Sequence, residues 1–256
     1  MSLLNSWSMI VWLSFRRALW SASTLMVSMP LLACGLFILR RRFDRAEYFE
    51  HAFNSFSHFI AIAFAGFIVP IISLAYGTAS IGGDREDRTL LFLLVRPIPR
   101  PLVLLGKYAA TLPLTVGLAV ASFYVYCQLA GRVGAMAYEL YLPAVVCMTL
   151  AYTGLFHLFA VLFRHATIVA LVYALFMELI LGNLPGIVKR LTVSYYGRSM
   201  MYAAGNPEGF ESPDWYPDWY EPLSAAAGLQ TLLAIAVGSI LLAMIVFERR
   251  EYRDLS

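Results

Sequence analysis

Charged side chains are scarce in this chain. Asp, Glu, Lys and Arg make up 14% of its 256 residues, whereas 60% of the residues are hydrophobic. A soluble domain has about 25% charged residues, and no soluble fold of this size hides so large an apolar fraction. The scarcity of charge therefore excludes a soluble domain and predicts a protein that crosses the bilayer several times, with no nucleic-acid partner.

Motifs for nucleotide binding and catalysis are also missing. Gly106-Lys107 is followed by Tyr108 rather than Ser or Thr, and no glycine precedes it at the P-loop spacing. The three cysteines show no metal or disulfide spacing, and no Ser/His/Asp or Cys/His order suggests a nucleophile. We therefore expect no enzymatic activity, metal or directly bound cofactor in this chain. Any ATP hydrolysis must occur on another polypeptide.

Long stretches without charge lie between the few charged clusters. Each is at least 22 residues long, and Glu178 alone interrupts one of them. A helix that crosses a hydrocarbon core of roughly 30 Å needs about 20 apolar residues, and continuous apolar runs favour helices over a barrel. The predicted fold is an all-α membrane protein with six transmembrane helices. We expect these spans at about 21–39, 58–80, 108–129, 141–163, 167–184 and 224–246.

Residues 3–18 are expected to form an amphipathic helix on the membrane surface, ahead of the six spans. Arg16 and Arg17 close this segment and suit anionic lipid headgroups. An extension of the first span into residues 3–18 is the alternative. One apolar stripe recurs at three- and four-residue steps: Leu4, Trp7, Val11, Phe15 and Ala18.

The charged connector 84–107 follows the second span. Paired glycines, Gly82 and Gly83, are expected to end that span, and Asp84 to cap a short new helix with an acidic first turn. A leucine-rich face follows, and three prolines then forbid helix continuation. Lys107 is expected at the water boundary, where its stem can snorkel. The connector therefore suits a groove in a partner protein, or alternatively lies among lipid headgroups.

Three motifs in this stretch resemble the ABC type-2 membrane permease family, the transmembrane subunits of ABC transporters whose ATPase is a separate chain. Arg88 stands where the family usually has glycine. The six spans, the surface helix and the long segment before the last span also fit, so the resemblance covers the whole chain. The motifs are Glu86-Asp87-Arg88-Thr89-Leu90, Arg96-Pro97-Ile98-Pro99-Arg100 and Leu105-Gly106-Lys107.

The resemblance implies a function. It implies that the chain is the permease subunit of an exporter and that it pairs with a second copy or a paralogue. It also implies that the permease couples to an ATPase subunit, which holds the ATP. A secondary transporter and a non-transporting membrane scaffold, both without an ATPase, are the alternatives. The residues that the resemblance assigns to ATPase coupling are Asp84, Arg85, Glu86, Asp87, Arg88, Thr89, Leu90, Arg96 and Pro97.

Two further features remain open in the sequence. Glu178 is an ionisable residue inside a span, so it lies either on a substrate path or in an interhelical hydrogen bond, or else near the wetted interface. The segment 185–222 is rich in Trp and Tyr. It is expected to be an external loop, which either anchors in the headgroup layer or caps the translocation path.

Orientation follows from the distribution of Lys and Arg. With both termini in the cytoplasm of a cell whose inner membrane holds the protein, eleven of the 19 basic residues lie inside and eight outside. Reporter fusions test this prediction. A fusion near Arg88 is expected to report the cytoplasm and one near Gly205 the exterior, and the reverse result would contradict the orientation.

Overall fold

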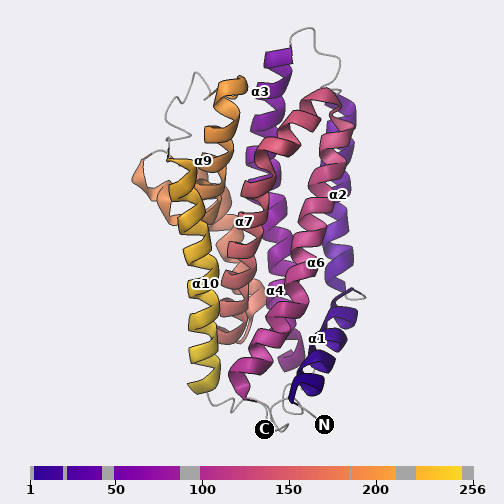
Figure 1. The fold of residues 1–256 in the computed structure, drawn as a ribbon, viewed down its shortest axis with the longest axis vertical. Coiled ribbons are helices and arrows are strands. Elements are labelled where there is room, and N and C mark those ends of the chain that lie inside the picture. The colour runs from indigo at the N-terminus through magenta and orange to yellow at the C-terminus, as the bar shows by residue number, and fades with distance from the viewer. Residues whose placement is uncertain are drawn as a thin grey trace.

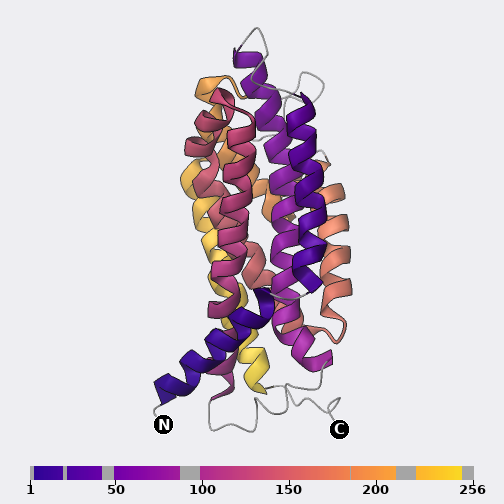
Figure 2. The ribbon, with the colours of Figure 1, turned by 90° about the vertical axis from the view of Figure 1, so that its right-hand side faces the viewer.

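The fold is one elongated bundle of helices that run along its long axis (Figures 1 and 2). We describe it from a computed structural model, in which residues 3–19, 22–41, 49–86, 99–184, 186–211 and 223–249 are described. Within these ranges the chain forms helices and no strand. The all-α prediction is therefore confirmed for this part of the chain.

Within the described ranges, π and 3-10 segments accompany the α-helices at three places: between α3 and α4, between α8 and α9, and after α9. The elements are α1 (Leu3–Leu19), α2 (Ala22–Arg41), α3 (Phe49–Phe59), the π-helix η2 (Ile60–Ile68), α4 (Val69–Glu86), α6 (Arg100–Leu129), α7 (Arg132–Leu162), α8 (Ala166–Tyr173), the π-helix η3 (Ala174–Ile180), the 3-10 turns η4 (Leu181–Asn183) and η5 (Ile187–Leu191), α9 (Val193–Gly205), the 3-10 turn η6 (Asn206–Glu208) and α10 (Ala225–Arg249).

In the described part of the chain, five helices are long and apolar enough to cross a membrane. The helix α2, with 20 residues, also runs along the bundle (Figure 1). A sixth span at α2 therefore stays a prediction. The five candidates are Phe49–Arg85, Arg100–Leu129, Arg132–Leu162, Ala166–Asn183 and Ala225–Arg249.

The helix that holds the second expected span is much longer than 58–80. Helical structure is continuous from Phe49 to Glu86, with the π-helix η2 in its middle. The expectation that Gly82 and Gly83 end the helix is wrong, because glycine costs a helix interior only about 1 kcal/mol. The helix α6 likewise begins at Arg100, where Pro101 supplies a favourable first turn.

A tight turn joins α6 to α7. Gly131 adopts a φ of 67°, which side chains with a Cβ rarely accept. Three residues later, a Cβ on Gly134 would lie 1.9 Å from the carbonyl oxygen of Cys127. Both glycines are needed for the two helices to approach this closely.

The expected external loop 185–222 contains a packed helix. α9 lies against α7 and α10, and Val193, Tyr195 and Met201 on it are buried. Its Gly197 abuts Met148 of α7 so closely that a Cβ there would lie 1.9 Å from the sulfur. The central part of this segment is thus helical and interior rather than a surface loop. The Trp/Tyr repeat at 213–220 lies outside the described residues.

The N-terminal helix α1 slants across one end of the bundle and packs against the beginning of α6 (Figure 2). Trp7, Val11 and Phe15 of the predicted stripe are half-buried, whereas the neighbouring Trp12 is 63% exposed. The stripe therefore faces protein. The position of α1 on a membrane surface stays a prediction.

Candidate functional site

A buried carboxylate joins three helices at the end of the bundle where the connector leaves it. Asp84 lies in the last turn of α4 and is 3% exposed. Its Oδ1 accepts a hydrogen bond from Nη1 of Arg17 on α1 at 2.7 Å, and its Oδ2 accepts one from Nζ of the buried Lys107 on α6. We call Asp84, Lys107 and Arg17 the charge brace.

The charge brace corrects two expectations. Asp84 does not cap a new helix: it lies in the last turn of α4, where the helix dipole disfavours a carboxylate and two cations offset that cost. Lys107 does not reach water from the start of a span, because α6 begins seven residues earlier and places it inside. A desolvated ammonium needs a partner of opposite charge, and Asp84 supplies it.

The neighbouring contacts extend this anchoring. On α1, Nε1 of Trp7 donates a hydrogen bond of 3.1 Å to the carbonyl oxygen of Leu102 on α6. On α4, Nη1 of the buried Arg85 donates one of 3.1 Å to the carbonyl oxygen of Phe163, where α7 ends. Four helices are thus tied together around the two ends of the connector.

The expected coupling residues divide at the edge of the described chain. Asp84 and Arg85 are buried inside the bundle and make the contacts above. Glu86 is the last residue of α4, and nothing is described of its side chain. The others lie outside the described residues: Asp87, Arg88, Thr89, Leu90, Arg96 and Pro97.

Glu178 is fully buried, at 0% exposure, in the π-helix η3. Its Oε1 accepts hydrogen bonds from the hydroxyl of Tyr173 and the backbone N–H of Val193, and its Oε2 accepts one from the N–H of Ser194, all at 3.0 Å. The carboxylate therefore holds the first two N–H groups of α9, which have no partner within that helix. The structure favours the hydrogen-bonding alternative over the wetted interface.

Arg198 makes the reciprocal contact, from α9 back to the arm that carries Glu178. It is buried on α9, and its Nη1 donates hydrogen bonds to the carbonyl oxygen of Gly182 at 3.3 Å and to Oδ1 of Asn183 at 2.8 Å. These acceptors lie at the end of the preceding helical arm, where carbonyl groups lack helical partners. We call Glu178 and Arg198 the hairpin brace. Glu178 binds backbone groups at the start of α9, which carries Arg198, and Arg198 binds groups at the end of the arm that carries Glu178.

The guanidinium of Arg198 also lies against Gly66 of the π-helix η2, where the absence of a Cβ leaves room for its Nη2. Sequence reasoning missed Arg198. Its signal was a lone charge within a 13-residue helix otherwise free of charge.

No group of three or more His, Cys, Asp and Glu side chains in the described ranges is arranged to hold a metal ion. The ionisable groups instead hold helices together.

A bundle of long apolar helices whose buried charges brace helix ends defines a multi-pass membrane protein. The family model described as "ABC-2 family transporter protein" matches residues 9–252, and the chain belongs to that family. It is a membrane permease subunit of an ABC transporter. No curated protein compared with the chain matches it significantly.

The charge brace predicts a stability effect. Asp84→Asn leaves Lys107 buried without a counter-ion, which costs about 3–5 kcal/mol of the free energy of unfolding. Adding Lys107→Met removes the second charge and is expected to restore most of this loss. Thermal unfolding of the purified variants measures both, and a double variant no more stable than Asp84→Asn would contradict the pairing.

The hairpin brace predicts another. In Glu178→Gln, an amide NH₂ faces the backbone N–H donors of α9, so one donor loses its acceptor at a cost of about 1–3 kcal/mol. Thermal unfolding is expected to show this loss, and Glu139→Gln, at an exposed position on α7, is the control. Equal stability of the two variants would contradict the capping role.

Proposed function

We propose that the chain is the membrane subunit of an exporter whose ATPase is a separate polypeptide. Residues 84–107 couple the ATPase to the bundle, and two copies, or one copy and a paralogue, form the permease. The ATP stays on the partner subunit. Membership of the ABC-2 family supports this proposal, since such permeases work beside an ATPase.

The charge brace is the observation that carries the coupling proposal. A segment pushed by a partner moves the spans only if its base is fixed to them. Here α4 leads into the connector and α6 leads out of it, and Asp84 and Lys107 join these two helices in the buried interior. Because a buried ion pair is costly to break, the two helices respond to the connector as one unit.

The helix α1 belongs to the same unit. Arg17 near its end binds Asp84, and Trp7 near its beginning binds the backbone of α6. A partner that touches either the connector or α1 thereby acts on α4 and α6 together. This supports α1 as a second element, beside the connector, that contacts the ATPase.

The arrangement of the helices supports the placement of both termini on the same side of the membrane. α1, the Arg249 end of α10 and the helix ends that flank the connector all lie at one end of the bundle (Figure 1). An ATPase in the cytoplasm places this end inside the cell. We therefore propose an inner-membrane location with cytoplasmic termini.

Charge reversal in the connector tests the function. Glu86→Lys combined with Asp87→Lys is expected to abolish transport-linked ATP hydrolysis and to reduce recovery of the ATPase by about tenfold, as loss of about 1.4 kcal/mol of binding does. The measurement is affinity purification of the tagged chain from native membranes, with identification of the partner chains and their ATPase activity.

Glu139→Lys is the matched control, because it reverses an exposed acidic residue near the α6–α7 turn, at the far end of the bundle (Figure 1). It is expected to leave ATPase recovery unchanged. A wild-type chain that brings down no P-loop ATPase would support a secondary transporter or scaffold instead. Full recovery and full activity with the doubly reversed chain would show that the connector does not couple.

A further inference from the structure

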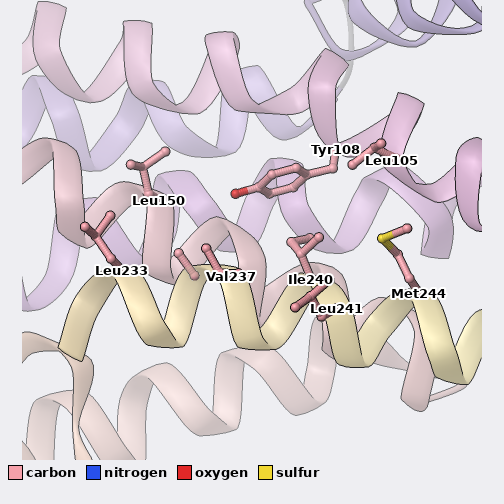
Figure 3. Close-up of a pocket in the computed structure, with 9 residues that line it drawn as sticks. Leu105, Tyr108, Leu150, Leu233, Val237, Ile240, Leu241 and Met244 are labelled. Atoms are coloured by element: carbon pink, nitrogen blue, oxygen red, sulfur yellow. The ribbon is translucent and has the colours of Figure 1, made fainter. Parts of the chain in front are cut away.

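An apolar groove runs along the outside of the bundle between α6 and α10. Its volume is about 430 Å³. Leu105 and Tyr108 of α6 form one side, Leu150 of α7 lies toward the Leu233 end, and six residues of α10 from Leu233 to Met244 form the other side (Figure 3).

The groove exists because α10 is drawn toward α7 rather than α6. At Gly154 of α7 the two backbones are so close that a Cβ would lie 2.9 Å from the carbonyl oxygen of Ala236. On the opposite wall, the ring of Tyr108 packs edge-on against His157, with ring centroids 5.2 Å apart. His157 is itself held by hydrogen bonds to Thr111 and Thr153. Both walls are therefore fixed.

The rim of the groove faces the hydrocarbon of the membrane. Val237 is 58% exposed, Leu241 53% and Leu233 41%, on a helix that we treat as a membrane span. An apolar groove does not hold water, which needs polar partners, and an empty one forfeits the dispersion contacts of its lining. The acyl chains of the surrounding bilayer can fill the groove.

The length of the groove fits one acyl chain. From Leu233 to Met244 the groove extends about 16 Å at 1.5 Å per residue, which is half of a hydrocarbon core of about 30 Å. One acyl chain of one leaflet matches this length.

The charges beyond the groove indicate the headgroup. Glu248 follows Met244 by four residues and so lies on the same face of α10, and Arg249 comes next. Both are exposed, about one helical turn past the groove's end. An adjacent acid and base complement an ammonium and a phosphate carried by one lipid.

We propose that this groove binds one acyl chain of a phosphatidylethanolamine molecule, whose ammonium group meets Glu248 and whose phosphate meets Arg249. The lipid fills the part of the seam between α6 and α10 that lies beside their direct contact at Leu104, Ala243 and Phe247. The site is independent of the ATPase partner and of any substrate.

Native mass spectrometry of the full chain, purified from its membrane in mild detergent, tests the acyl-chain site. The wild type is expected to retain one phospholipid per chain. Val237→Trp places a ring in the groove and is expected to lower the lipid-bound fraction at least about tenfold. Leu242→Trp is the control, because Leu242 is 48% exposed on α10 but does not line the groove.

Equal retention by the two tryptophan variants would overturn the proposal. So would a Val237→Trp chain that keeps its lipid but loses self-association, since a second copy would then cover the groove. For the headgroup, the wild type is offered equal phosphatidylethanolamine and phosphatidylcholine. The wild type is expected to retain several-fold more phosphatidylethanolamine than phosphatidylcholine. Glu248→Gln is expected to retain the two lipids equally. Equal retention by the wild type would overturn the assignment of the headgroup.

Discussion

The pairing of Asp84 with Lys107 and Arg17 is the constraint on which the coupling end of the bundle depends. A carboxylate at the end of α4 and an ammonium inside α6 are each costly to bury, and neither position is tolerable without the other. Burying them together fixes α4 against α6 at the point where the connector leaves and returns. The packed residues Ile81, Leu104 and Phe247 form a small apolar core in the same region.

The hairpin brace solves a related problem elsewhere in the bundle. Where the chain turns back before α9, one helical arm ends and another begins inside the protein, so N–H and carbonyl groups of both termini lack helical partners. Glu178 and Arg198 bind these groups from opposite arms. The few charges within this apolar chain therefore replace the backbone hydrogen bonds that a broken helix loses.

The pattern of charge predicted the helical class and the approximate position of most helices, because only apolar helices of sufficient length satisfy their backbones in lipid. It placed Asp84 and Lys107 at boundaries, since no local signal shows that residues 23 positions apart meet in the interior. α9 was missed for a similar reason. Its aromatic residues fit a headgroup belt equally well, and the contacts that bury it come from α7 and α10. The family resemblance, confirmed over residues 9–252, came from the connector motifs.

The π-helix η2 bears on how the chain can change in length. Its nine residues, Ile60–Ile68, follow a wider hydrogen-bonding pattern than the α-helices on either side. A π-helix turns less per residue than an α-helix, so loss of one residue there, with relaxation of the segment to an ordinary α-helix, largely preserves the direction of the helix that follows. Loss of a residue from the α-helical stretch that follows η2 instead rotates everything beyond it by about 100°, and Asp84, sixteen residues downstream of η2, then faces away from Lys107. The register of this distant ion pair is therefore less sensitive to a one-residue deletion in η2 than to one elsewhere in the same helix.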